Sequence, residues 1–177
     1  GTRLRSQAST VMVFSNDARG PFTLESQPDA AEGYGFEKRQ AEARVFHQNP
    51  AALVARLGWQ IDRAPVGNTM LRALQDEVAQ QGRVRASRKW IPACAFLSDT
   101  ADARVKMAAS PEIDPGLYML DGNAEDALSY FEIASALAEG RGWDVEPTDD
   151  FVYDQRMIDP RMRLPHVRDR LQASHAG

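Results

Sequence analysis

The segment YGFEKRQAEARVFHQNP, residues 34–50, decides the fold because it has a helical pattern and lies between two apolar runs. Good helix formers extend from Ala31 to about Gln48, and Asn49 followed by Pro50 is typical of a helix end. The runs ASTVMVF (8–14) and AALVARLGW (51–59) each predict a short buried strand. Strand, helix and strand in this order predict a βαβ unit with parallel strands, and hence an α/β protein.

A long polar stretch, SNDARGPFTLESQPDAAEG (15–33), separates the first strand from the helix. It contains two prolines and two glycines and shows no sustained periodicity, so it predicts a loop. Long connections without secondary structure often bind ligands. We therefore expect a functional site near this loop.

The remainder of the chain continues the α/β pattern. Further strands are predicted over 83–87 and 116–122. Helices are predicted over 67–81, 98–109, 124–140 and 165–172, the second of them capped by Ser98 or Asp99.

Composition narrows the class of protein. The chain has 177 residues, 43% of them hydrophobic, and a formal net charge of −4, which gives no electrostatic reason to expect a nucleic-acid partner. No run approaches the length of a membrane-spanning helix. The single cysteine, Cys94, excludes an internal disulfide and favours a reducing compartment, with the cytoplasm as the default expectation.

Tyr34 and Lys38 are the candidate catalytic pair. Residues four apart lie one above the other on a helix, so the lysine ammonium can approach the phenol. A nearby positive charge favours the phenolate and lowers the tyrosine pKa from its ordinary value near ~10, which makes the phenol a usable acid or base. Ser9 and Thr10, at the end of the preceding strand, could orient a substrate oxygen. The alternative is that the tyrosine only packs and the lysine is only solvated.

An ordered set of motifs resembles a known family. STVMVFSN (9–16), YGFEKRQAE (34–42) and ALVARLGW (52–59) are followed by NTMLRAL (68–74), SDTADA (98–103) and GLYMLDGNAEDALSYFEIASAL (116–137). In this order and spacing they resemble the extended short-chain dehydrogenases/reductases that act on nucleotide sugars, specifically the dTDP-4-dehydrorhamnose reductase branch. The resemblance extends over roughly residues 8–172.

The resemblance implies a fold and a function. The fold would be a partial Rossmann-like parallel sheet, formed by the last strands of a dinucleotide-binding domain (1–62), together with a small α/β substrate-binding lobe (63–177). The function would be reduction of a nucleotide-linked 4-keto-6-deoxy sugar with NADPH or NADH. The expected partners are therefore a nucleotide-sugar substrate and no nucleic acid or membrane, with a homodimer left open.

The resemblance also implies roles for particular residues. Tyr34 would exchange a proton with the sugar C4 oxygen. Lys38 would lower the pKa of Tyr34 and hydrogen-bond the nicotinamide ribose, so both residues would also contact the cofactor. Thr10, with Ser9 as second choice, would bind the reacting carbonyl, and Trp59 would form a wall of the sugar pocket.

Other charged residues have two interpretations each. Arg156 lies where the family often carries an arginine near the substrate, yet it could equally pair with Asp154 or Asp159. The cluster Arg85, Arg88 and Lys89 could meet a diphosphate, although a solvated surface run is the commoner outcome. The three histidines, His47, His166 and His175, lack the spacing of metal ligands, so no metal is expected.

Departures from the family pattern at residues 11–12, 15–16 and 88–99, and the absence of a dinucleotide fingerprint, qualify the prediction. Val11 and Met12 stand where the family usually has an aspartate and a tyrosine. They provide no extra acid or base, which favours simple reduction over the alternatives of an epimerase or a dehydratase. The Gly-x-Gly at 140–142 follows a helix and lacks the third glycine of a dinucleotide fingerprint.

The missing fingerprint predicts that roughly one hundred residues of the full enzyme, and with them most of the cofactor site, lie outside this chain. If it does not, a non-catalytic sugar-nucleotide-binding or regulatory subunit is the remaining alternative.

Overall fold

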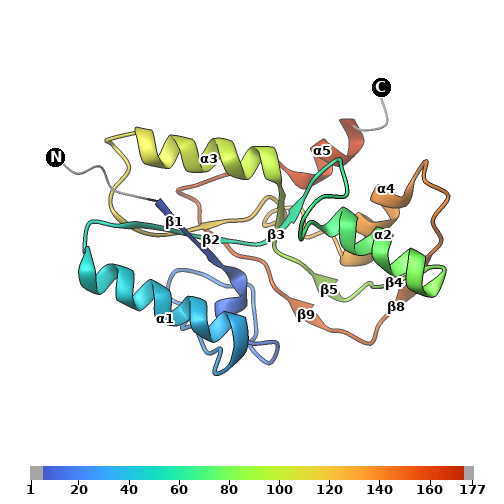
Figure 1. The fold of residues 1–177 in the computed structure, drawn as a ribbon, viewed down its shortest axis with the longest axis horizontal. Helices are drawn as coiled ribbons and strands as arrows, with labels where there is room; N and C mark the ends of the chain where they lie inside the picture. Colours follow the sequence, from blue (N-terminus) through green and yellow to red (C-terminus); the bar gives the residue numbers. More distant parts are fainter. Residues whose placement is uncertain (1–5, 174–177) are drawn as a thin grey trace.

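The predicted βαβ unit is present in the computed structural model, which describes residues 6–173. Strand β1 (Ser6–Thr10) leads through the long loop to helix α1 (Gly33–Gln48) and then to strand β2 (Leu53–Leu57). β1 and β2 are parallel, and β2 also pairs in parallel with β7 (Gly116–Leu120). The resulting sheet has the strand order β1-β2-β7 (Figure 1).

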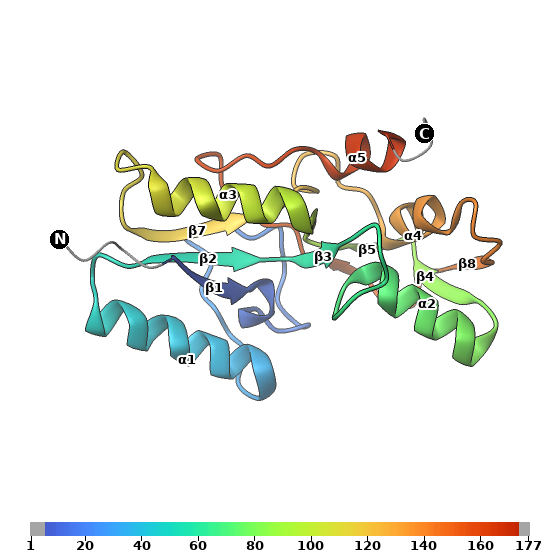
Figure 2. The same cartoon turned by 45° about the horizontal axis from the view of Figure 1, so that its top comes forward.

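Helices cover both faces of this sheet. Figures 1 and 2 show α1 on one side and α3 (Leu97–Ala109) on the other. Beneath α3, Leu53 and Ala55 of β2 pack with Leu120 of β7 and Met107 of the helix. Strands buried on both faces are typical of parallel sheets, which explains why 51–57 is almost continuously apolar.

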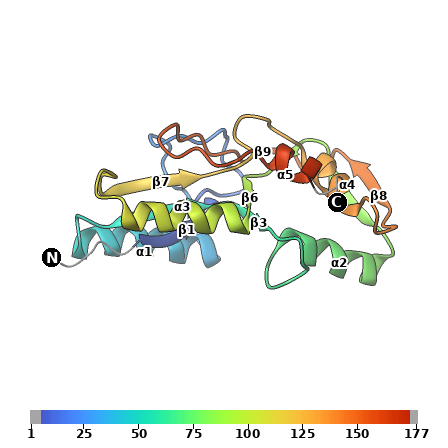
Figure 3. The same ribbon diagram turned by 90° about the horizontal axis from the view of Figure 1, so that it is seen from above.

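The other strands form three two-stranded parallel pairs. These are β3 (Trp59–Ile61) with β6 (Cys94–Phe96), β4 (Val84–Ser87) with β8 (Val145–Thr148), and β5 (Trp90–Ile91) with β9 (Tyr153–Asp154). Helices α2 (Met70–Gln81), α4 (Tyr130–Ala138) and α5 (Val167–Ala173) complete this part of the fold. Figure 3 shows α2, α4 and β8 at the end of the molecule opposite α1.

Several predicted element bounds differ from the observed ones, and at three of them a specific contact explains the difference. The first strand ends at Thr10, not near Phe14, because the Thr10 side chain accepts the Met12 N–H and starts a 3-10 turn, η1 (Val11–Val13). The run 51–59 divides into β2 and β3 at Gly58. A Cβ on Gly58 would lie 2.3 Å from the Ala93 carbonyl oxygen, so the chain of β6 passes too close for any side chain.

The helix predicted from residue 124 begins only at Tyr130. Ser129 caps it, with its side chain accepting the Glu132 N–H and the Glu132 carboxylate accepting the Ser129 N–H. Neither Ser98 nor Asp99 caps α3, whose N-cap is Phe96. Asp99 instead binds the guanidinium of Arg170.

Two local expectations, the end of α2 and the burial of Cys94, are confirmed. α2 ends at Gly82, which adopts the left-handed conformation at the C-cap. Cys94 is fully buried among apolar neighbours. Within residues 6–173, no helix combines the length and apolarity needed to cross a bilayer. The predicted boundary at residue 62 stays a prediction, and β7, from beyond it, pairs in the same sheet as β1 and β2.

Candidate active site

The carboxyl ends of β1 and β2 and the start of α1 border a cleft of about 780 Å³. Ligands of open parallel sheets bind at this edge of the strands. The lining residues come from the first strand and its turn, the helix start, the β2–β3 junction and three later segments: Ala8, Ser9, Thr10, Val11, Met12, Asn16, Tyr34, Lys38, Leu57, Gly58, Trp59, Gln60, Asn68, Trp90, Phe151 and Gln155. The cleft thus brings together five residues that the sequence predicted to lie in one site: Ser9, Thr10, Tyr34, Lys38 and Trp59.

The Tyr34–Lys38 pair faces this cleft. Tyr34 lies in the first turn of α1 and remains 52% exposed, so it does not pack into the interior. The Lys38 Nζ lies 5.8 Å from the centroid of the Tyr34 ring. A cation at this distance is attracted to the ring face, so the two side chains lie together at the cleft. The arrangement therefore suits proton transfer to a ligand in the cleft.

Gly35 sets the position of this pair. A Cβ at residue 35 would lie 2.0 Å from the carbonyl oxygen of Met12. Only glycine allows the first turn of α1 to approach η1 so closely. The close approach places Tyr34 and Lys38 beside the end of β1, which carries Thr10.

The two neighbouring hydroxyls have opposite hydrogen-bond roles. The Thr10 Oγ1 accepts the Met12 N–H at 3.1 Å, so its own proton remains to be donated. The Ser9 Oγ instead donates to the Glu42 Oε1 at 2.5 Å. Of the two candidates, Thr10 is therefore the hydroxyl that can donate into the cleft.

A buried ion pair beneath the cleft was not predicted. The Glu42 carboxylate accepts hydrogen bonds from Arg56 Nε, at 2.9 Å, and from Arg56 Nη2, at 2.8 Å. Both side chains are buried. The sequence did contain a signal: Glu42 is one helical turn after Lys38, and Arg56 interrupts an otherwise apolar strand. Opposite charges in two segments expected to pack together indicate a buried pair.

Aromatic side chains form one wall of the cleft. The Trp59 and Trp90 rings are stacked with centroids 6.0 Å apart, and Phe151 meets Trp90 edge to face at 5.3 Å. The Trp59 Nε1 donates to the carbonyl of Asn68. Trp59 belongs to this wall, and its contact with a sugar stays a prediction. Trp90, Phe151 and Gln155 were missed because nothing local ties these distant segments to residue 59.

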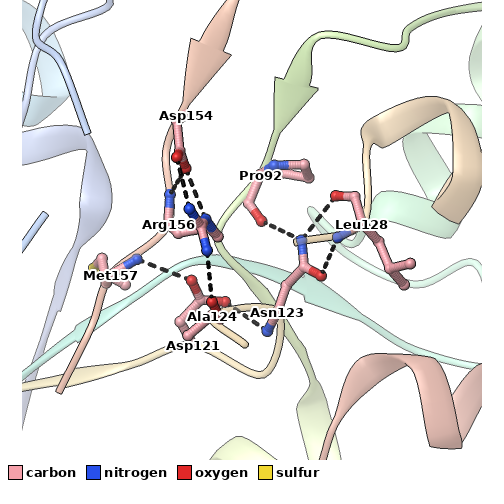
Figure 4. Close-up of polar contacts among 8 residues, drawn as sticks. All are labelled: Pro92, Asp121, Asn123, Ala124, Leu128, Asp154, Arg156 and Met157. Carbon is pink, nitrogen blue, oxygen red and sulfur yellow. Dashed lines mark hydrogen bonds and ion pairs between the residues drawn. The ribbon is translucent and has the colours of Figure 1, made fainter. Parts of the chain in front are cut away.

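Arg156 is placed outside the cleft lining. Its guanidinium binds both carboxylate oxygens of Asp154, at 2.9 Å each, and donates to the Ala124 carbonyl (Figure 4). Of the two interpretations, the structure therefore shows pairing with Asp154. A substrate contact for Arg156 stays a prediction.

Beside Arg156, Asp121 and Asn123 join separate segments of the chain (Figure 4). Asp121 accepts the backbone N–H groups of Cys94, Asn123 and Met157. Burial raises the pKa of Asp121 to about 7, against the opposing effect of those three donors. Burial, with Asp121 nearby, also raises the pKa of the Cys94 thiol well above its ordinary range.

The remaining charged candidates form surface ion pairs. Arg88 binds both oxygens of Asp149, and Arg85 lies near Glu146 and Asp150. His166 contacts Glu125 and Asp126. Among residues 6–173, no group of three or more His, Cys, Asp or Glu side chains could hold a metal ion. His47 is exposed, and His175 lies outside the described residues.

No protein-family model matches the chain, and the comparison with curated proteins gives no match either. Solved structures do match. The dTDP-4-dehydrorhamnose reductase of Bacillus anthracis, in complex with NADP, superposes with a TM-score of 0.74 at 16% identity, covering 97% of this chain and 64% of that one. This chain has the fold of the extended short-chain dehydrogenases/reductases. The predicted resemblance and fold class are thereby confirmed at the level of fold.

The same extended short-chain dehydrogenase/reductase fold occurs in enzymes of other activities. ADP-L-glycero-D-manno-heptose-6-epimerase of Helicobacter pylori matches with a TM-score of 0.67 at 19% identity, covering 97% of this chain and 60% of that one. The dTDP-glucose 4,6-dehydratase of Bacillus anthracis, in complex with NAD, gives 0.58 at 14% identity, with 97% and 55% covered. The chain thus spans about three fifths of the length of these enzymes.

Proposed function

We propose that this chain carries the proton-transfer and sugar-binding part of an NAD(P)H-dependent reductase acting on a nucleotide-linked 4-keto-6-deoxy sugar. The observation that carries the proposal is the meeting of Tyr34, Lys38 and Thr10 at one cleft. An acid, a cation that supports it and a second hydroxyl donor are what reduction of a carbonyl requires from the protein.

Each of the three residues has a separate role at the sugar C4 carbonyl. The Thr10 hydroxyl, whose oxygen already accepts the Met12 N–H, donates a hydrogen bond to the C4 oxygen and holds it in place. The hydride for the C4 carbon would come from a nicotinamide dinucleotide, which Lys38 and Tyr34 would hold by its ribose. Tyr34 gives its phenolic proton to the C4 oxygen, which completes the alcohol, and Lys38 stabilises the phenolate left behind. Because Tyr34 is half exposed, solvent can return its proton.

The described residues fit only the nicotinamide end of such a cofactor. Lys38 and Tyr34 would hold the nicotinamide ribose at the mouth of the cleft. Gly33 and Gly35 form a second Gly-x-Gly at the start of α1, but Lys38 occupies the place of the third glycine of the fingerprint. Gly35 packs against the Met12 carbonyl, so this turn does not form a pyrophosphate cradle.

The chemistry of the lining supports reduction over dehydration. No carboxylate, imidazole or thiol belongs to the described residues that line the cleft. Tyr34 and Lys38 are the titratable side chains described there, and Lys38 serves to support the phenolate and to hold the cofactor ribose. Elimination of water from a sugar requires a second acid or base beside the tyrosine. Hydride and proton addition to a single carbonyl does not.

Two measurements test the proposal. Isothermal titration of the chain with dTDP-rhamnose and with NADPH reports binding, and NADPH oxidation by the native protein in the presence of dTDP-4-dehydrorhamnose reports turnover. Tyr34→Phe should lower kcat by about 100-fold or more and leave the affinity for dTDP-rhamnose within about twofold.

The matched control is Tyr118→Phe, which removes a phenol that hydrogen-bonds the Asp114 carbonyl away from the cleft. It should keep wild-type turnover. Unchanged turnover in Tyr34→Phe would remove this residue from the mechanism. Binding of dTDP-rhamnose without turnover in the wild type would favour a sugar-nucleotide-binding subunit.

A further inference from the structure

The buried carboxylate of Glu42 joins three elements that together form the candidate active site. It belongs to α1, two turns after Tyr34 and one turn after Lys38. Its two oxygens receive three donors: Ser9 Oγ from β1, and Nε and Nη2 of Arg56 from β2. Glu42 is 7% exposed and does not line the cleft itself.

These contacts determine where the Ser9 proton points. A carboxylate paired with a guanidinium only accepts hydrogen bonds, so the Ser9 hydroxyl must donate to it. The proton of Ser9 is thereby turned away from the cleft. Thr10, whose oxygen already accepts from Met12, is left as the single hydroxyl donor of the pair.

The same contacts set the distance between helix and strand. The ion pair ties α1 to β2, and the bond to Ser9 ties α1 to the end of strand β1, immediately before Thr10. Together with the close approach at Gly35, the bonds define the gap between the Tyr34 phenol and the Thr10 hydroxyl. Charge-assisted hydrogen bonds are short and directional, so they favour one geometry for this gap.

We propose that Glu42 is a positioning residue of this site. It acts through Ser9 and Arg56. It directs the Ser9 proton away from the cleft, and it holds the helix that carries Tyr34 and Lys38 at a fixed distance from Thr10. The inference rests on the proposed function, because its consequence is a change in turnover. A structural ion pair without this role would affect stability alone.

The test is Glu42→Gln, which preserves shape and removes the charge. We expect kcat to fall by about tenfold or more while KM changes by less than about twofold. The reason is that a shift of a fraction of an ångström between Tyr34 and Thr10 weakens binding of the transition state but not of the substrate ground state. Affinity for dTDP-rhamnose, measured by isothermal titration, should stay within about twofold.

Asp159→Asn provides the matched control. Asp159 is 7% exposed and binds both Nε and Nη2 of Arg161, but it lies outside the cleft lining. Both variants should lose thermal stability, and only Glu42→Gln should lose kcat. Equal kcat in Glu42→Gln and the wild type, with a lower Tm, would overturn the proposal.

Ser9→Ala keeps the test decisive if Glu42→Gln does not fold, since the Glu42–Arg56 pair survives in it. A several-fold loss of kcat with KM within about twofold supports the positioning role. A rise in KM of about tenfold would show that Ser9 binds the substrate directly and would overturn the inference. A wild-type protein with neither binding nor turnover would instead remove the proposed function.

Discussion

Replacing Gly35 by alanine tests the geometry on which the site depends. By helix propensity alone, Gly→Ala in α1 should stabilise the protein by up to about 1 kcal/mol. The structure predicts the opposite sign. The new Cβ would lie 2.0 Å from the Met12 carbonyl oxygen and 2.9 Å from its carbonyl carbon, both backbone atoms, whereas real Cβ contacts essentially never fall below 3.0 Å. The first turn of α1 and η1 must therefore separate by about 1 Å.

The magnitude follows from this separation. Overpacking that moves backbone costs about 1–3 kcal/mol, so we expect Gly35→Ala to lower the free energy of unfolding by about 2 kcal/mol after the propensity gain. A displacement of about 1 Å between Tyr34 and Thr10 should reduce kcat by up to about 100-fold. Urea denaturation followed by tryptophan fluorescence measures the first quantity, and NADPH oxidation by the native protein measures the second.

Gly82→Ala is the control for the Gly35 experiment. No atom lies within 4 Å of a Cβ at residue 82, but its φ of +78° is left-handed. It should therefore cost about 1–2 kcal/mol by backbone strain alone and leave kcat unchanged. If Gly35→Ala were as stable as the wild type or more so, with full turnover, α1 could not pack against η1 as described, and the reasoning for the site would fail.

Three further predictions concern the rest of the fold. Burial raises the pKa of Asp121 from 3.8 to about 7, so the folded protein holds a proton that the unfolded chain releases. The free energy of unfolding should therefore fall as pH rises from about 4 to about 7. Urea titrations across this range should show a shallower decline in Asp121→Asn than in the wild type, and equal slopes would contradict the assignment. Ser129→Ala removes the capping box of α4 and should lower the free energy of unfolding, measured by urea denaturation, by about 1 kcal/mol. The control Ser135→Ala, inside the same helix, should leave this free energy unchanged or raise it slightly. Equal effects of the two variants would refute the cap. Cys94, fully buried and with its pKa raised, should not react with a thiol reagent until the protein unfolds, and rapid labelling of the native state would contradict its placement.

Local sequence patterns were sufficient for the elements that depend on neighbouring residues. The helix over 33–48, its end before Pro50 and the left-handed stop at Gly82 follow from propensities and backbone restrictions that act within a few residues. The capping box at Ser129 and Glu132 also has a local signature, although the prediction started that helix at residue 124.

Contacts between distant segments decided the features that were missed. The close approach of Ala93 divides β2 from β3, and no pattern within residues 51–59 indicates it. Trp90, Phe151 and Gln155 reach the cleft only through the parallel pairing of β5 with β9. The partner of Arg156 likewise depended on the path of the chain after β9, since Asp154 and Asp159 are both near it in sequence.

The sequence by itself determined that this is an α/β protein with a βαβ unit, and that Tyr34 and Lys38 share a face of the first helix after a Ser-Thr strand end. Helical periodicity and strand alternation are properties of the local chain, so they can be read directly from it. Only the tertiary structure decided that Ser9 donates to Glu42 while Thr10 keeps its proton. The direction of a hydroxyl depends on which acceptor lies beside it, and here that acceptor is brought from 33 residues away by the packing of α1 on β1.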